Sequence, residues 1–181
     1  MEEQVKKVVI IGPESTGKSE LSSRLANHYG TLYVPEFARQ YLTTNGTAYT
    51  INDLIEIAIG QLATEEWLTI QCREKGKNLL FVDTDLQVIK TWGEFVFNRC
   101  DNNILKEIAT RKYHLFLLCN TDLPWVKDEL REYPDPETRM RLFHHYRDAL
   151  IQQEVPWVEI SGVAEERFRQ GVDAVEKYIY Q

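Results

Sequence analysis

The chain has 181 residues, 43% of them hydrophobic and 27% charged, and its formal net charge is −7 at pH 7. This length suits one domain whose core needs no disulfide or metal, so we expect a single domain over residues 1–181. The acidic balance argues against a general binder of nucleic acids or anionic membranes, because such proteins usually present a basic face.

The sequence also predicts a cytoplasmic protein without membrane insertion. Its three cysteines lie far apart and lack metal-ligand spacing, which fits a reducing compartment better than a disulfide framework. The apolar run near the first residue is too short for a signal peptide or a membrane span, and we expect none elsewhere. The oligomeric state stays open, a homo-oligomer included.

Apolar runs that alternate with helical patterns predict a parallel sheet covered by helices on both faces. The strand-like runs lack polar alternation, which is typical of strands buried on both sides. They cover residues 8–12, 79–83, 115–119 and 157–160, with a weaker run at 31–34. Helical spacing predicts helices at 18–29, 52 to about 75, 102–112, 136–153 and 165–180. Within the last helix, we expect the stretch EERFRQ to be solvent-exposed.

The stretch GPESTGKS, from Gly12 to Ser19, matches the phosphate-binding pattern G-x-x-x-x-G-K-[ST]. It lies between a predicted buried strand and a predicted helix, where backbone N–H groups and a helix N-terminus converge on phosphate oxygens. We expect Lys18 to reach the β- and γ-phosphates of ATP and the Ser19 hydroxyl to bind Mg²⁺. The predicted nucleotide-binding residues are Gly12, Pro13, Glu14, Ser15, Thr16, Gly17, Lys18, Ser19 and Glu20.

This motif and the alternation of elements together predict an α/β fold of the P-loop NTPase type. We expect a three-layer sandwich with a five-stranded parallel sheet and helices on both faces. Three functional classes use such a fold. A GTPase switch needs D-x-x-G and N-K-x-D, whereas the corresponding stretches here read DTDL at 83–86 and CNTDL at 119–123. A mechanical ATPase usually ends its acidic strand in Asp-Glu, which the VDTD at 82–85 does not match.

The third class, a small-molecule kinase, needs an arginine-bearing lid that neutralises charge as the γ-phosphoryl group moves. A polar, proline-containing stretch supplies the candidate, which we place at about residues 127–141. It carries Arg131, Arg139 and Arg141, of which we expect Arg131 and Arg139 to be catalytic. A solvated helix start with incidental arginines is the alternative interpretation.

A kinase also needs a carboxylate that orients or deprotonates the acceptor hydroxyl. Asp83 ends a predicted buried strand, at the edge where a doubly wound sheet binds its ligand, and we expect it to hold Mg²⁺. Asp85 follows two residues later and is a candidate to face the acceptor. Glu36 and Arg39 are three residues apart just past the weaker strand, so a helical turn places both on the side of the acceptor pocket. A surface ion pair between these two is the alternative.

Several of these stretches together resemble the ribosylnicotinamide kinase domain of NadR-type proteins. They are GPESTGKS, VPEFARQYL, the GQ pair at 60–61, FVDTDLQVIKTW, and YHLFLLCNTDLPWVKDELRE through PETR, in this order over about residues 8–150. The resemblance implies ATP-dependent phosphorylation of the ribose 5′-hydroxyl of nicotinamide riboside to nicotinamide mononucleotide, a step of NAD biosynthesis. Because the phosphate loop begins almost at the first residue, we expect a stand-alone kinase unit, without the adenylyltransferase and DNA-binding parts of NadR proteins.

The resemblance further implies that Glu36 or an acid of the DTD turn is the base, that Arg39 lies near the transferred phosphate, and that Gln61 reaches the nucleobase end. A cationic pyridinium ring also favours an aromatic face, which Trp92 can offer unless it only packs in the core. The predicted catalytic residues are thus Lys18, Glu36, Asp85, Arg131 and Arg139, and the predicted substrate-binding residues are Glu36, Arg39, Gln61, Asp85 and Trp92. The alternatives are a kinase for another nucleoside or small alcohol, and a regulatory ATP-binding module without catalysis.

Overall fold

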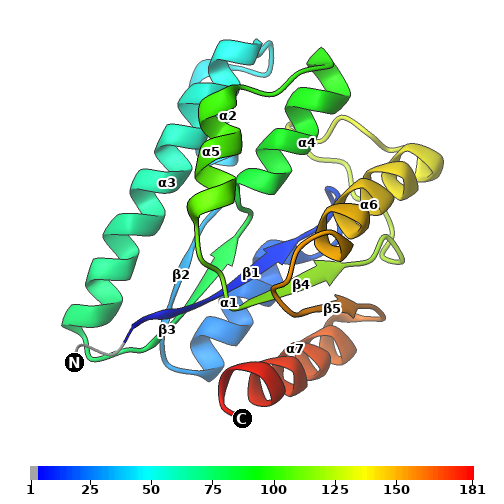
Figure 1. The fold of residues 1–181 in the computed structure, drawn as a ribbon. Helices are drawn as coiled ribbons and strands as arrows, with labels where there is room; N and C mark the ends of the chain where they lie inside the picture. Colours follow the sequence, from blue (N-terminus) through cyan, green and yellow to red (C-terminus); the bar gives the residue numbers. More distant parts are fainter. Residues whose placement is uncertain (1–3) are drawn as a thin grey trace.

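The computed structural model describes residues 4–181, which form one five-stranded sheet and seven helices (Figure 1). In chain order the elements are β1 (Lys6–Ile11), α1 (Lys18–His28), β2 (Leu32–Val34), α2 (Phe37–Asn45), α3 (Ile51–Glu74), β3 (Leu79–Asp83), α4 (Leu86–Phe97), α5 (Asn102–Thr110), β4 (Leu115–Cys119), α6 (Pro136–Ile151), β5 (Trp157–Ile160) and α7 (Ala164–Ile179). No helix in this described part of the chain is both long and apolar enough to cross a membrane.

The strands pair in the order β2-β3-β1-β4-β5, and every neighbouring pair is parallel. β1 lies at the centre, with Val8 opposite Phe81 of β3 and Leu115 of β4. The strands β3 and β4 are buried along their whole length because helices cover them on both sides. All carboxyl ends therefore lie along one edge of the sheet, the edge at which folds of this kind bind their ligands.

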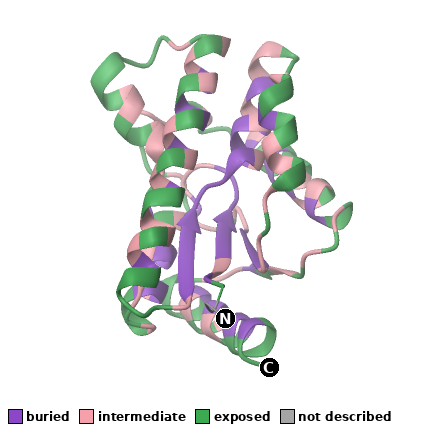
Figure 2. Ribbon diagram, turned by 60° about the vertical axis from the view of Figure 1, so that its left-hand side comes forward, coloured by how far each residue is buried: buried purple, intermediate pink, exposed green. Residues whose placement is uncertain are grey.

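Successive residues of β1 point to opposite faces of the sheet and enter two separate cores. Val8 and Ile10 pack against α1 and α7 on one face. Val9 and Ile11 pack against the helices α3, α4 and α6 on the other face. Figure 2 shows the central strands buried and the helices exposed on their outer sides. This arrangement confirms the predicted three-layer fold.

A third apolar cluster joins α2, α3, α4 and α5, the helices that extend beyond the sheet in Figure 1. Phe37 of α2 belongs to it and packs directly on α3. Gly60 makes this approach feasible, because a Cβ there would lie 2.1 Å from the Phe37 ring. The cluster thus fixes the start of α2 against α3 and builds one wall of the site described below.

The observed strands match the predicted runs closely, and β3, β4 and β5 match them at both ends. The sequence predicts only a helical turn where α2 forms, and it predicts no helix where α4 forms. The α4 sequence LQVIKTWGEFVF is rich in β-branched and aromatic residues, which favour strands when taken alone. The α2 sequence FARQYLTTN is short and ends in residues of low helix propensity. Both helices form because their apolar side chains pack in the third cluster.

Candidate active site

The phosphate loop connects β1 to α1 in the setting that the sequence predicts. Its backbone adopts positive φ at Gly12 (145°), Ser15 (58°) and Gly17 (77°). A Cβ at Gly12 would lie 2.6 Å from the Cys119 carbonyl oxygen, so glycine is needed where the loop passes β4. Lys18 begins α1, and its Nζ donates to the Pro13 carbonyl oxygen at 2.8 Å. The loop therefore delivers a lysine and a helix N-terminus to one place, a combination that suits an anion.

A cavity of about 300 Å³ joins this loop to the helical wall, a size usual for small organic ligands. Its lining comes from the phosphate loop, the start of α2, one side of α3 and α4, and the chain after β4. The lining residues are Gly12, Glu14, Ser15, Thr16, Gly17, Lys18, Ser19, Glu20, Glu36, Ala38, Arg39, Leu42, Tyr49, Leu54, Ile57, Gln61, Thr84, Val88, Ile89, Trp92, Leu130, Arg131 and Glu132. Most predicted site residues are thus brought together. The described residues predicted for the site that do not line it are Pro13, Asp83, Asp85 and Arg139.

Asp83 ends β3 beside the phosphate loop and is only 1% exposed. Its burial, reinforced by the negative charge of Glu36, raises its pKa to about 6. The Lys18 ammonium and the hydroxyls of Ser19 and Thr84 act in the opposite direction and lower this pKa. Glu36, Lys18 and Ser19 therefore gather around a single carboxylate. A hydroxyl and a carboxylate are oxygen ligands of the kind that Mg²⁺ prefers, so this pair fits the predicted metal site.

Asp85 has a different environment from Asp83. Its carboxylate accepts a hydrogen bond from the Gln87 backbone N–H at 3.1 Å and so caps α4. Burial raises the pKa of Asp85 to about 7, and the charge of Glu65 contributes in the same direction. Of the two carboxylates predicted to face an acceptor, Glu36 lines the cavity and Asp85 does not. The catalytic role of Asp85 stays a prediction.

Glu36 and Arg39 lie at the start of α2, where Glu36 is the N-cap residue with extended backbone. Arg39 pairs with Asp128 from the chain after β4, through Nη1–Oδ1 and Nη2–Oδ2 distances of 3.3 Å and 3.2 Å. The partner of Arg39 is therefore not Glu36. Glu36 instead lines the cavity, and it lies near enough to Asp83 for its negative charge to raise the pKa of that carboxyl.

The far end of the cavity is apolar and aromatic. The Trp92 ring meets the Tyr49 ring edge to face at a centroid distance of 6.1 Å and the Tyr133 ring at 5.7 Å. Gln61 lines the same cavity and is 1% exposed. Its Oε1 accepts from the Phe37 N–H at 2.8 Å, whereas its Nε2 has no hydrogen-bond partner among residues 4–181. A buried amide donor that lines a cavity is a position where a ligand acceptor is expected.

The chain from 120 to 135, which we call the β4–α6 segment, contacts the phosphate loop and carries the first part of the predicted lid. Arg131 lies in it and lines the cavity. Arg139 belongs to the first turns of α6 and is 4% exposed. It donates to the carbonyl oxygens of Ser15 and Leu123, both at 3.2 Å. Arg139 thus links α6 to the phosphate loop and does not line the cavity, whereas Arg131 is the predicted lid arginine that lines it.

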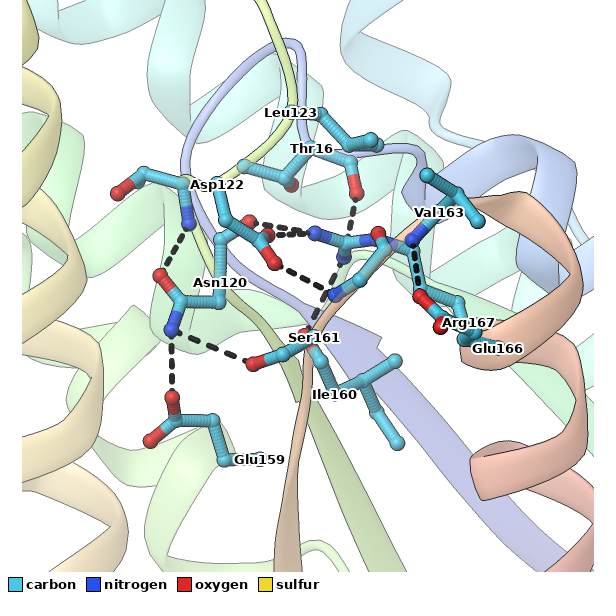
Figure 3. Close-up of polar contacts among 12 residues, drawn as sticks. Thr16, Asn120, Asp122, Leu123, Glu159, Ile160, Ser161, Val163, Glu166 and Arg167 are labelled. Carbon is cyan, nitrogen blue, oxygen red and sulfur yellow. Dashed lines mark hydrogen bonds and ion pairs between the residues drawn. The ribbon is translucent and has the colours of Figure 1, made fainter.

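One buried arginine was missed by the sequence interpretation. The stretch EERFRQ was expected to be exposed, which is wrong for Arg167, because this residue is only 2% exposed. Its guanidinium pairs with Asp122 and donates to carbonyl oxygens of the phosphate loop and of the ends of β4 and β5 (Figure 3). These acceptors are Thr16 at 3.1 Å, Asn120 at 3.1 Å, Ile160 at 3.3 Å and Gly162 at 2.7 Å. Helical spacing with Gly171 and Ala174, on the inner side of α7, is the signal that reveals it.

Comparison with known proteins agrees with this geometry. A family model described as AAA domain (AAA_28) matches residues 7–167. The chain is 25% identical over 160 residues to the trifunctional NAD biosynthesis/regulator protein NadR of Salmonella typhimurium, and equally to that of Escherichia coli. These alignments cover 86% of this chain but 38% of each relative, so the chain spans well under half the length of those proteins.

Solved structures share the fold. A crystal structure of NadR protein in complex with NR has a TM-score of 0.81 at 21% identity and covers 98% of this chain and 50% of that one. A deoxyadenosine kinase from M. mycoides has a TM-score of 0.59 at 12% identity, over 94% of this chain and 99% of that one. The resemblance to NadR-type proteins is therefore confirmed, and the chain belongs to the AAA domain family AAA_28.

Proposed function

We propose that this protein is a Mg²⁺- and ATP-dependent kinase that phosphorylates the ribose 5′-hydroxyl of nicotinamide riboside to give nicotinamide mononucleotide. The observation that carries the proposal is that the phosphate loop, Glu36 and the aromatic end of the cavity, formed by Tyr49 and Trp92 and called the chamber below, line one and the same cavity. The similarity to NadR proteins over most of the chain supports the same acceptor.

The phosphate loop is the proposed site for the ATP phosphates. Its N–H groups and the N-terminus of α1 would surround phosphate oxygens, and Lys18 would leave the Pro13 carbonyl oxygen to bind them. Ser19 and Asp83 would hold Mg²⁺ together with those phosphates. Within residues 4–181, no cluster of three or more His, Cys, Asp or Glu could hold a metal ion. Phosphate oxygens are therefore needed to complete the coordination, and the bound metal would supply positive charge to them.

Glu36 is the proposed general base. It lines the same cavity as the phosphate loop and Trp92, so a 5′-hydroxyl bound in this cavity would lie within its reach. In the reaction this oxygen forms a bond to the γ-phosphorus, the bond from that phosphorus to the β-γ bridging oxygen breaks, and ADP leaves. The hydroxyl proton passes to the Glu36 carboxylate.

Two arginines would offset the negative charge that develops during the transfer. Arg131 lines the cavity from the β4–α6 segment, and Arg39 lines it from α2. Arg39 is now paired with Asp128, an exposed contact of the kind that contributes little to stability. A phosphate group that enters the cavity would compete with Asp128 for this guanidinium.

The chamber fits a flat ring with a carbonyl substituent. Trp92 and Tyr49 offer aromatic faces, which attract a cationic pyridinium. The Gln61 Nε2, which has no hydrogen-bond partner within residues 4–181, would donate to the carboxamide oxygen of the base. A pyrimidine also has ring carbonyls, so a kinase for another nucleoside is the second candidate that this donor supports.

The test measures ADP formation from ATP in the presence of Mg²⁺ and one nucleoside at a time. The nucleosides are nicotinamide riboside, cytidine, uridine, adenosine and guanosine. We expect strong stimulation by nicotinamide riboside and its loss in Lys18→Ala. Preference for another nucleoside would replace the acceptor while leaving the kinase assignment intact. ADP formation that responds to no acceptor would instead support an ATP-binding module without phosphoryl transfer to a nucleoside.

A further inference from the structure

Glu14 belongs to the phosphate loop, yet its carboxylate binds the β4–α6 segment. Its Oε1 accepts hydrogen bonds from the Trp125 indole Nε1 at 3.2 Å and from the Tyr133 backbone N–H at 2.6 Å. Its Oε2 accepts from the Glu132 backbone N–H at 3.0 Å. Three donors from two parts of one segment thus converge on a single side chain.

The next loop residue adds a second attachment. The Ser15 hydroxyl oxygen accepts from the Val126 N–H at 2.9 Å. Between the two attachments lies Arg131, whose Nη1 donates to the Val126 carbonyl oxygen at 2.5 Å and whose side chain lines the cavity. The segment is therefore fixed to the loop on both sides of the arginine that faces the site.

We propose that Glu14 is a positioning residue that anchors the β4–α6 segment to the phosphate loop and so holds Arg131 at the cavity. The backbone N–H groups that Glu14 accepts belong to Glu132 and Tyr133, the two residues directly after Arg131. Fixing them restricts the backbone from which the guanidinium extends, and the hydrogen bond to Val126 restricts its other end.

The charge of Glu14 supports this role over a role in phosphate binding. An unneutralised carboxylate in a loop that gathers N–H groups around phosphate would repel that phosphate. The hydrogen bonds from Trp125, Glu132 and Tyr133 direct the carboxylate toward the segment. The anchoring itself is independent of the reaction, whereas its catalytic consequence rests on the proposed kinase function.

Hydrogen–deuterium exchange of the intact protein without ligand tests the anchor. Glu14→Gln keeps the size of the side chain but replaces one acceptor oxygen by an NH₂ group that faces N–H donors. We expect peptides covering 124–135 to exchange about tenfold faster, the change that corresponds to losing one charge-assisted hydrogen bond. Trp125→Phe removes one of the three donors and is expected to give a smaller acceleration in the same peptides.

The matched control is Glu129→Gln, which makes the same charge change at an exposed position of the same segment. We expect this variant to exchange as the wild type does. Exchange in Glu14→Gln at the wild-type rate would overturn the anchor. Acceleration of equal size throughout the chain would overturn it as well, since that result reports general destabilisation rather than release of one segment.

Kinetics test the positioning of Arg131. The assay uses the nucleoside that stimulates ADP formation in the test under Proposed function. With it, we expect Glu14→Gln to lower kcat at least tenfold and to change KM for ATP less than threefold. The reason is that the variant displaces the Arg131 charge, which is aligned only for the transition state. Faster exchange in the peptides covering 124–135 together with an unchanged kcat would overturn the positioning role. Faster exchange of these peptides in a protein that phosphorylates no acceptor would confirm the anchor and contradict the proposed function. Failure of the anchor and failure of the proposed function are therefore distinguishable.

Discussion

Glu36 and Asp83, from different strand ends, share one electrostatic environment beside the phosphate loop. Asp83 has a pKa of about 6 because it is buried and because the Glu36 carboxylate is near it. Glu36 is the member of this pair that lines the cavity. The two carboxylates thus have separate places: Asp83 lies at the end of β3 near Ser19, and Glu36 lines the cavity. This separation favours a metal-holding role for the first and a proton-accepting role for the second.

Replacing Glu36 tests the second role. We expect Glu36→Gln to lower kcat by about 10²- to 10⁴-fold, the usual contribution of a general base. Binding of ATP in the absence of acceptor should be unchanged or tighter, because the variant removes a negative charge near the phosphates. Steady-state kinetics and calorimetric titration with ATP give the two numbers. Glu154→Gln, an exposed acid remote from the cavity, is the control. An equal loss of ATP affinity in Glu36→Gln would mean that Glu36 binds the nucleotide.

Replacing Asp85 tests whether its burial has an energetic cost. Its pKa of about 7 in the folded protein exceeds the ordinary value of 3.8. The folded state therefore retains a proton between these values that the unfolded state has released, and stability falls as the pH rises from about 4 through 7. Asn is neutral and also caps helices. We expect Asp85→Asn to be as stable as the wild type below pH 4 and more stable at pH 8, by an amount of the order of 4 kcal/mol.

Urea unfolding at several pH values between 4 and 8 measures this difference. A stability difference that does not grow with pH would show that Asp85 is stabilised as a charged group. Kinase activity in the same variant is a separate measurement. Retained turnover would assign Asp85 to capping, and a large loss of kcat with a normal fold would restore the catalytic role predicted from the sequence.

The elements that carry strong local signals were predicted well. The phosphate loop, the buried strands β3 and β4, and the start of α6 depend on residues close in the chain, such as the Asp135 carboxylate that accepts from the Thr138 N–H at 2.7 Å. The exposed or buried state of an arginine depends on distant partners instead. Arg167 is buried because the phosphate loop, β4 and β5 present carbonyl groups to it. Helical spacing can place Arg167 on the inner side of α7, but it does not identify these distant partners.

The same reason explains the lid and the carboxylates. Arg131 and Arg139 are similar in sequence context, but the fold directs Arg131 to the cavity and Arg139 to the carbonyl oxygens of Ser15 and Leu123. From the sequence, Glu36 and Asp85 are equal candidates for the general base. In the structure, the Asp85 carboxylate caps the N-terminus of α4. Side-chain roles of this kind follow from tertiary contacts rather than from spacing.

Replacing Arg167 tests its structural role. Arg167→Met keeps the length and the apolar contacts of the side chain but leaves Asp122 and several carbonyl groups without their donor. Breaking a buried pair by removing one partner costs about 3–5 kcal/mol, and we expect a loss of stability in the lower part of this range because Asp122 is partly exposed. Thermal or urea unfolding measures it, with Arg169→Met in the same helix as control. A loss below about 1 kcal/mol, the value of a surface pair, would contradict the role of Arg167 as a buried link.

Gln61 offers a test of acceptor specificity that uses both protein and ligand variants. The wild type should prefer nicotinamide riboside over pyridinium riboside, which lacks the carboxamide, by about 10- to 100-fold in kcat/KM, because the second ligand leaves the Gln61 Nε2 unpaired. Gln61→Glu keeps an acceptor for the Phe37 N–H but removes the amide donor. In this variant we expect the preference to fall close to one.

The cycle of two enzymes and two nucleosides isolates the proposed hydrogen bond from general damage to the chamber. A structural defect would lower kcat/KM for both nucleosides by the same factor and would leave their ratio unchanged, a result that contradicts the contact. Gln61→Leu removes both polar groups and is expected to lose the preference as well. Because Leu also removes the acceptor for the Phe37 N–H, its thermal stability should fall below that of Gln61→Glu, and the ratio of the two nucleosides remains the decisive measurement.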